Sequence, residues 1–155
     1  MKYYLAYGSN LSVEQMLLRC PDAVYVGTGE IKGYRLLFRG SLTGSYLTIE
    51  KKKGRSVPVV VWKVSEQDEM ALDRYEGYPR FYRKEECTIE VCSLIDGAAT
   101  HAVTAFVYVM DEGRALGRPS ERYYRVCAEG YERFGFDLRV LNRAVKESTE
   151  KLFGL

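Results

Sequence analysis

Strands are predicted wherever apolar and polar residues alternate or apolar residues run together between turn residues. The segment 57–64, VPVVVWKV, is so apolar that it predicts a central strand buried on both faces, with Pro58 at its start. The basic run Lys51-Lys52-Lys53-Gly54-Arg55 is interpreted as a solvated hairpin tip, with a nucleic-acid patch as the lesser alternative. Asp96-Gly97 predicts a second hairpin. Strands are expected over Lys2–Ala6 and residues 24–26, 34–39, 46–50, 57–64, 82–92 and 101–110.

Helices are predicted by their end signals. Ser12 and Gln15 have the spacing of a capping box, and Val13, Met16 and Leu17 supply an apolar face. A second helix is expected to begin at Ser65, to carry acidic residues in its first turn and to end at Gly77, with Pro79 beyond. A third opens at Pro119-Ser120 and runs to Phe134, where Gly135 breaks it. Asp137 caps a fourth, whose apolar stripe is Leu138, Leu141, Val145 and Leu152.

These elements predict an α+β fold, because the strands cluster along the chain and are mostly joined by turns. The expected architecture is a small mixed, mostly antiparallel β-barrel flanked by helices. A length of 155 residues predicts one domain, spanning residues 1–155.

Composition and charge narrow the classes of partner and compartment. With 23 basic and 21 acidic residues the net charge is +2, which argues against a strongly electrostatic partner such as DNA. No stretch approaches the roughly 20 apolar residues of a membrane span, and no signal peptide is recognised, so a cytoplasmic protein is expected. The four cysteines form no CxxC pair and His101 is the single histidine, so no metal site is predicted. The cysteines are expected to be reduced and buried or half-buried. A catalytic cysteine is the lesser alternative, because no histidine lies beside any cysteine in the sequence, although sequence distance does not exclude a catalytic pair with His101.

The stretch Tyr7-Gly8-Ser9-Asn10 lies between the first strand and the first helix. Gly8 permits a positive φ and close approach of a ligand to the backbone. Successive N–H groups in such a turn can bind an anion, and the following helix points its N-terminus at the same place. The stretch lacks the glycine spacing and lysine of a phosphate-binding P-loop. An ordinary strand-to-helix turn and an anion site both remain open.

Glu76 is the candidate general acid or base. It falls in the last turn of its helix, where the negative end of the helix dipole disfavours ionisation. Burial among Tyr75, Tyr78 and Phe81 would raise its pKa further. A carboxyl group with a raised pKa can exchange protons near neutral pH. The alternative is a solvent-facing glutamate near a helix end.

Three motifs together resemble the γ-glutamylcyclotransferases (AIG2-like). They are YGSNL after the first strand, LDxxEG at residues 72–77 about 65 residues later, and PSxxY at residues 119–123. The resemblance runs from Tyr4 to about Phe136, and the YGSNL spelling is closest to the branch that acts on γ-glutamyl amino acids, including bacterial relatives that act on antibiotic precursors. It implies a small β-barrel flanked by helices. The implied reaction converts an L-γ-glutamyl amide to 5-oxoproline and a free amine.

The resemblance also implies the roles of individual residues. Glu76 matches the family's acid/base, the loop from Tyr7 to Leu11 matches the part that holds the glutamyl group, and Tyr123 matches a substrate-binding position. No metal or redox cofactor is implied, the partner is a small γ-glutamyl compound, and a homodimer is allowed. The implied substrate-binding residues are Tyr4, Tyr7, Gly8, Ser9, Asn10, Leu11, Tyr82, Tyr108 and Tyr123.

Two other functions are weighed against this one. An inactive small-molecule-binding module on the same fold would keep the pocket, but the presence of Glu76 argues against it. A single-stranded nucleic-acid binder could use a tyrosine-rich barrel, but the near-neutral charge does not suggest a basic groove. The leaving group is not revealed, because the segments expected to wall the rest of the pocket, residues 40–46 and 111–118, cannot be oriented from sequence.

Overall fold

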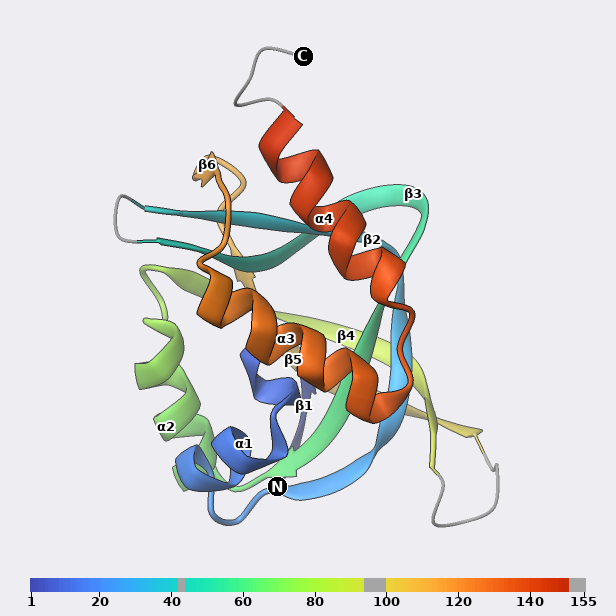
Figure 1. Cartoon of the computed structure of the whole chain (residues 1–155). Coiled ribbons are helices and arrows are strands. Elements are labelled where there is room, and N and C mark those ends of the chain that lie inside the picture. Colours follow the sequence, from blue (N-terminus) through green and yellow to red (C-terminus); the bar gives the residue numbers. More distant parts are fainter. Residues whose placement is uncertain (42–43, 94–99, 151–155) are drawn as a thin grey trace.

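Five strands close into a barrel in the computed structural model, which describes residues 1–41, 44–93 and 100–150 (Figure 1). The strand order is β3-β1-β5-β4-β2, and β2 pairs again with β3. The β1–β5 pair is parallel and the other barrel pairs are antiparallel. The predicted α+β class and mixed, mostly antiparallel barrel are therefore confirmed. The strands are β1 (Lys2–Ala6), β2 (Val24–Ser41), β3 (Gly44–Val64), β4 (Tyr82–Cys92), β5 (Thr100–Met110) and the short edge strand β6 (Ala115–Leu116).

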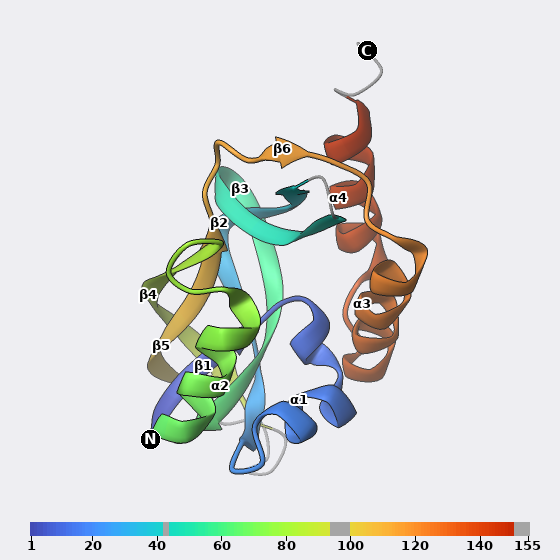
Figure 2. The ribbon, with the colours of Figure 1, turned by 90° about the vertical axis from the view of Figure 1, so that its left-hand side faces the viewer.

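Helices cover the barrel from several sides. Figure 2 shows α2 and α3 on opposite sides of β3, with α1 between their lower parts and α4 beside the upper part of β2. The four predicted α-helices are present in the described residues. Their bounds are α1 (Val13–Arg19), α2 (Glu66–Glu76), α3 (Glu121–Phe134) and α4 (Leu138–Glu150), and a one-turn 3₁₀ helix, η1 (Ser9–Leu11), precedes α1.

Caps define the ends of α2 and therefore place Glu76. The Asp68 N–H donates to Ser65 Oγ (3.1 Å), and the Ser65 N–H donates back to Asp68 Oδ2 (3.2 Å). At the other end Gly77 adopts φ 66°, a left-handed conformation that suits glycine. Both predicted boundaries are confirmed, and Glu76 is the last residue of the helix.

The capping box predicted for α1 is only half formed. Ser12 Oγ accepts from the Gln15 N–H (3.3 Å), as expected of an N-cap. The Ser12 N–H, however, donates to the Ser9 carbonyl (3.0 Å), because η1 runs directly into α1. Met16 is buried, whereas Leu17 is 43% exposed, so the apolar face is narrower than predicted.

The β2–β3 hairpin differs from the expected series of short strands. The two strands pair along most of their length, and the chain reverses between Ser41 and Gly44 rather than at Lys51-Arg55. Residues 52–55 bulge opposite Gly33, and both Gly33 and Gly54 have positive φ. This glycine-assisted bulge bends a continuous hairpin where the sequence pattern suggested a turn. The lysines of the run are exposed, as predicted.

The segment 57–64 is buried as predicted, but it is not a separate strand. All five of its valines and Trp62 are at most 2% exposed. Pro58 pairs with Glu30 in the interior of β3 rather than at a strand start, since β3 already begins at Gly44. On the far side of the barrel β4 and β5 pair in register from Tyr82–Met110 to Cys92–Thr100. The Asp96-Gly97 turn lies outside the described residues.

The buried face of α4 also differs from the predicted stripe. Leu141 and Ala144 are fully buried, but Leu138 is 42% exposed and Leu152 lies outside the described residues. Ser148 takes a buried position instead, because its hydroxyl accepts a hydrogen bond from the Phe38 N–H of β2 (2.8 Å).

The cysteines are unpaired, but not all are sheltered. Cys20 and Cys127 are buried and Cys87 is half-buried, whereas Cys92 is exposed, contrary to expectation. Within the described ranges no three His, Cys, Asp or Glu side chains are grouped to hold a metal ion.

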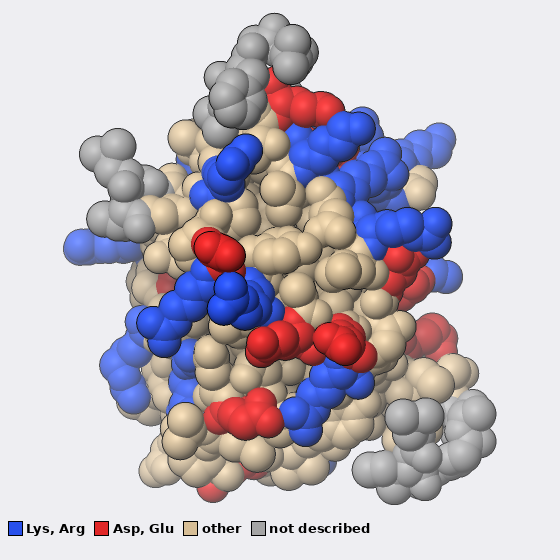
Figure 3. All heavy atoms as spheres, in the orientation of Figure 1, with Lys and Arg blue, Asp and Glu red and all other residues tan. Residues whose placement is uncertain are grey.

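In the same part of the chain no helix combines the length and apolar character needed to cross a membrane. Acidic and basic side chains are interspersed over most of the face in Figure 3.

Candidate active site

A cavity of about 390 Å³ opens between α2, α3 and the barrel. Its volume is in the range of small-molecule sites. The walls come from the end of β1 and η1, from β3, from the end of α2, and from single residues of β4, β5 and α3. The lining residues are Tyr4, Leu5, Tyr7, Gly8, Ser9, Asn10, Tyr46, Leu47, Arg74, Tyr75, Glu76, Gly77, Phe81, Tyr82, Tyr108 and Tyr123.

Glu76 is the carboxylate of this cavity. Burial raises its pKa to about 7, and the positive charge of Arg19 opposes that shift. The pKa of Glu76 is therefore raised, as predicted, and the cause is the predicted desolvation. Two of the three expected neighbours, Tyr75 and Phe81, line the cavity. Tyr78 does not, and its ring instead faces Lys84 Nζ at 4.4 Å.

Gly8 borders the cavity, although not in the expected conformation. Its φ is −126°, so the left-handed region is not used. The glycine leaves space instead: a Cβ at this position would lie 3.1 Å from the hydroxyl of Tyr123, which is a tight contact. The first bond of η1 runs from the Leu11 N–H to the Gly8 carbonyl (3.0 Å). The N–H groups of Ser9 and Asn10 therefore have no acceptor within that turn.

Asn10 ties the loop to its surroundings through three contacts. Its Nδ2 donates to Tyr4 Oη (3.0 Å), and its Oδ1 accepts from Arg19. Its carbonyl accepts from Trp62 Nε1 (3.2 Å). Because Asn10 is only 2% exposed, these bonds satisfy a buried amide and hold the loop against β1 and β3.

Leu11 lies outside the cavity. The structure brings the other eight expected binding residues and Glu76 to the cavity wall, but Leu11 is fully buried beneath α3. A Cβ on Gly130 would lie 2.5 Å from the Leu11 Cβ, so the helix packs directly on this leucine. Leu11 anchors the loop to α3.

Three of the cavity tyrosines direct their hydroxyl protons into the protein. Tyr7 donates to the Tyr108 carbonyl (2.6 Å) and Tyr82 donates to the Leu47 carbonyl (2.7 Å). Tyr108 donates to Asp73 Oδ1 (2.6 Å), which explains the aspartate of the LDxxEG motif. These three side chains present ring surface to the cavity while their hydroxyls support its walls.

Tyr4 and Tyr123 are different, because their hydroxyl oxygens act as acceptors. Tyr4 Oη accepts from Asn10 Nδ2, and Tyr123 Oη accepts from the Leu47 N–H (3.2 Å). Burial raises the pKa of both hydroxyls well above the usual value, so each keeps its proton. Tyr4 therefore has a proton to donate to a ligand, whereas the Tyr123 hydroxyl is also hydrogen-bonded to the Cys127 side chain.

Several lining residues were not identified from sequence. Tyr46 falls within a segment expected to wall the pocket, but its orientation needed the β2–β3 pairing. Arg74 lies inside the LDxxEG motif at a variable position. Tyr75 was expected near Glu76, and its hydroxyl is also 2.9 Å from Ser9 Oγ. The only feature of the sequence that could have placed Arg74 and Tyr75 at the cavity is their position beside Glu76 in the LDxxEG motif.

Solved structures share this barrel and its flanking helices. A γ-glutamyl cyclotransferase aligns with a TM-score of 0.76 and 26% identity, covering 92% of this chain and 85% of that one. An uncharacterised protein from Homo sapiens aligns with a TM-score of 0.74 and 27% identity over the same shares. The fold and the cavity thus define a small barrel of the cyclotransferase type.

Sequence comparison agrees with the structural one. The γ-glutamylcyclotransferase of Bos taurus is 28% identical over 142 residues, which are 87% of this chain and 72% of the bovine protein. The sequence model of the family described as "Gamma-glutamyl cyclotransferase, AIG2-like" matches residues 4–133. The chain belongs to this family, and the resemblance seen in the three motifs is confirmed.

Proposed function

We propose that this protein converts an L-γ-glutamyl amino acid or amide to 5-oxoproline and a free amine. The observation that carries the proposal is Glu76, a carboxyl group that faces the cavity and whose pKa burial raises to about 7. Such a group accepts and returns protons near neutral pH. Family membership supports the same reaction class.

The substrate supplies its own nucleophile, the α-amino group, so no serine or cysteine of the protein is needed. Glu76 takes a proton from the α-ammonium, and the free amine attacks the γ-carbonyl carbon. Glu76 returns this proton to the leaving nitrogen and takes the second proton from the α-nitrogen. The tetrahedral intermediate collapses with cleavage of the amide C–N bond, and Glu76 gives the second proton to the released amine. Overall the α-nitrogen loses two protons and the leaving nitrogen gains two, so the reaction consumes neither water nor an oxidant.

The loop from Gly8 to Asn10 is proposed to hold the glutamyl end. The N–H groups of Ser9 and Asn10 are suited to a carboxylate or a developing oxyanion. The hydroxyl of Tyr4 can donate to the same group. Folding the glutamyl chain so that its amine meets its carbonyl supplies proximity, worth up to roughly 7–11 kcal/mol in favourable intramolecular reactions.

The test is an assay of amine and 5-oxoproline release over γ-glutamyl amino acids, glutathione and γ-glutamyl amines. Glu76→Gln should keep its circular dichroism spectrum and lose turnover by about 10²–10⁴-fold. Glu66→Gln makes the same chemical change on the exposed first turn of the same helix and should retain activity. Wild-type turnover by Glu76→Gln would refute the acid–base role. No product from any compound would favour the inactive binding module.

A further inference from the structure

The cavity has a buried inner part and a partly exposed outer part that carries aromatic rings. Leu47, Tyr82 and Tyr108 are at most 6% exposed and lie at its base, near the proposed glutamyl site. Tyr46 is 36% exposed and Phe81 is only partly buried, so both lie toward solvent. A leaving group that extends outward from Glu76 can pack on these two rings.

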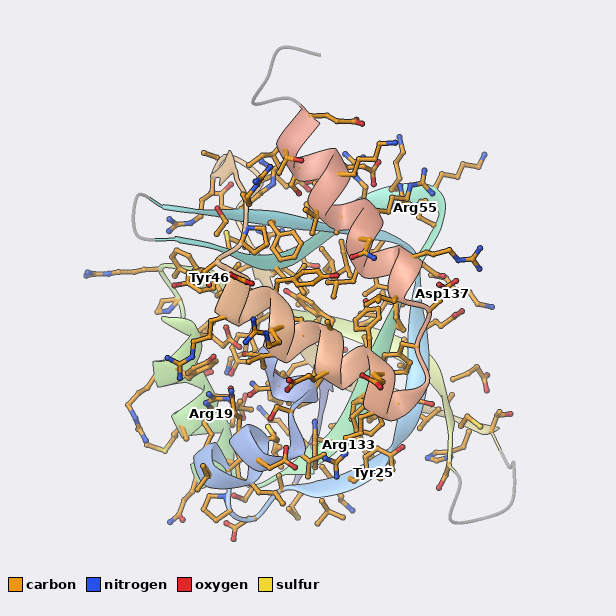
Figure 4. The ribbon with its side chains drawn as sticks, in the orientation of Figure 1. Arg19, Tyr25, Tyr46, Arg55, Arg133 and Asp137 are labelled. Carbon is orange, nitrogen blue, oxygen red and sulfur yellow. The ribbon has the colours of Figure 1, made fainter. Side chains whose placement is uncertain are left out.

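The outer rings form a connected, fixed surface. The centroids of Tyr46 and Phe81 are 6.2 Å apart at an interplanar angle of 78°, and Tyr46 meets Tyr123 edge-on at 5.2 Å. Figure 4 shows Tyr46 on the α2 side of the molecule, near the start of α3. The guanidinium of Arg114 covers Phe81 at 4.2 Å. Edge-to-face geometry of this kind accommodates a further aromatic ring.

Positive charge accompanies the aromatic surface. Arg74 lines the cavity and makes no ion pair with the described residues. Arg114, behind Phe81, likewise makes no ion pair in the described part of the chain and instead donates to the Arg80 carbonyl (3.3 Å). Glu76 is the only acidic lining residue and is assigned to the inner site. The outer part therefore favours an anionic group and disfavours a cationic one.

From these observations we infer that the leaving group is an α-amino acid with an aromatic side chain. This inference rests on the proposed function. Its ring packs on Tyr46 and Phe81, and its carboxylate pairs with Arg74. A leaving group that carries an extra ammonium, such as lysine attached through its ε-nitrogen, would bring positive charge toward the two arginines. The substrate class is γ-glutamyl conjugates of aromatic amino acids.

The test compares kcat/KM for γ-glutamyl-phenylalanine with the values for γ-glutamyl-alanine, γ-glutamyl-phenethylamide and the conjugate of lysine attached through its ε-nitrogen. γ-Glutamyl-phenylalanine should exceed γ-glutamyl-alanine by about 10–100-fold, the size of effect that a well-packed apolar pocket provides. It should exceed γ-glutamyl-phenethylamide, which lacks the carboxylate, by about 5–10-fold. Values within twofold for phenylalanine and alanine, or a preference for the ε-lysyl conjugate, would overturn the inference.

Variants separate the two contacts. Tyr46→Ala and Phe81→Leu should bring γ-glutamyl-phenylalanine toward the level of γ-glutamyl-alanine. Arg74→Gln should lower kcat/KM for γ-glutamyl-phenylalanine and leave the carboxylate-free amide unchanged. Arg125→Gln, an exposed arginine of α3 outside the cavity lining, is the matched control. An equal loss on both substrates in Arg74→Gln would contradict a carboxylate contact.

A binding measurement keeps this inference separate from the proposed reaction. Calorimetry with Glu76→Gln compares the affinities of γ-glutamyl-phenylalanine and γ-glutamyl-alanine without turnover. Tighter binding of the phenylalanine compound supports the inference even if the wild type releases no product, in which case the proposed reaction alone fails. Equal affinities overturn the inference even if both compounds are turned over.

Discussion

The guanidinium of Arg19 lies over the ring of Tyr75, 3.4 Å from its centroid. Arg19 comes from α1 and also donates to the side chain of Asn10, so it joins the loop to the end of α2 (Figure 4). The hydroxyls of Ser9 and Tyr75, 2.9 Å apart, make a second connection between the same two segments. The two halves of the cavity are therefore held together through the residue that precedes Glu76.

Arg19→Met should move the pH dependence of the reaction. The charge of Arg19 lowers the pKa of Glu76, so its removal should raise that pKa and shift the acid limb of kcat/KM to higher pH. Arg19→Lys keeps the positive charge and should shift the acid limb less. Arg133→Met, which removes an exposed arginine paired with Glu14, should leave the limb in place. An unchanged limb in Arg19→Met, with only a lower rate, would indicate a purely structural role.

The wild-type kcat/KM should rise with pH through about 7. Glu76 acts first as a base and so must be ionised, and burial raises its pKa to about 7. Activity is therefore lost as pH falls through this value. A pH–rate profile with γ-glutamyl-phenylalanine measures it. A limb near the ordinary glutamate value of 4.5 would show that another group controls the rate.

Glu76→Gln should stabilise the protein at alkaline pH. Because the folded-state pKa of Glu76 is raised from 4.5 to about 7, the folded state binds more protons than the unfolded state between these values. The contribution of Glu76 to stability is thus fully present below pH 4.5 and is lost as pH rises through about 7. Glutamine avoids this loss.

Urea unfolding measures the effect. At about pH 8 the variant should be more stable than the wild type by on the order of 1–3 kcal/mol, and the difference should shrink at about pH 5. The same difference at both pH values would mean that ionisation of Glu76 is not its cause.

Gly8→Ala should weaken substrate binding while the barrel still folds. The new Cβ would lie 3.1 Å from Tyr123 Oη, closer than a comfortable contact. We expect KM to rise by about tenfold, as for a mispositioned binding group. Tyr123→Phe removes that hydroxyl, so Gly8→Ala should cost less in this background. Additive effects in the double-mutant cycle would argue against this steric contact.

The cavity tyrosines should separate into two groups when changed to phenylalanine. Tyr4→Phe removes a hydroxyl whose proton is free for the ligand and should raise KM. Tyr82→Phe removes the donor to the Leu47 carbonyl and should lower stability by about 0.5–1.5 kcal/mol, with little change in KM. Steady-state kinetics distinguish the groups, whereas urea unfolding should show a loss for both, because Tyr4→Phe leaves Asn10 Nδ2 without its acceptor. A raised KM for Tyr82→Phe with an unchanged KM for Tyr4→Phe would mean that Tyr82, and not Tyr4, donates to the ligand.

Local signals in the sequence determined the helices and the position of Glu76. Ser65 and Gly77 define α2 because a cap and a left-handed C-terminal glycine act within one turn of the chain. The buried character of residues 57–64 was readable for a similar reason, since a run of β-branched residues needs a two-sided core. The resemblance to the family named Glu76 and eight residues that line the cavity, five of them within the three motifs and three (Tyr4, Tyr82 and Tyr108) outside them.

Tertiary structure alone decided how those residues meet. The bulge at Gly33 and Gly54 continues a hairpin that the sequence divides, because strand pairing between distant residues overrides the local turn signal. Packing against α3 buries Leu11, and the Tyr123 hydroxyl leaves little space for a side chain at position 8. The contact between Arg19 and Tyr75, and the aromatic wall of Tyr46 and Phe81, join segments far apart in the chain. Such contacts depend on closure of the barrel, which no local pattern encodes.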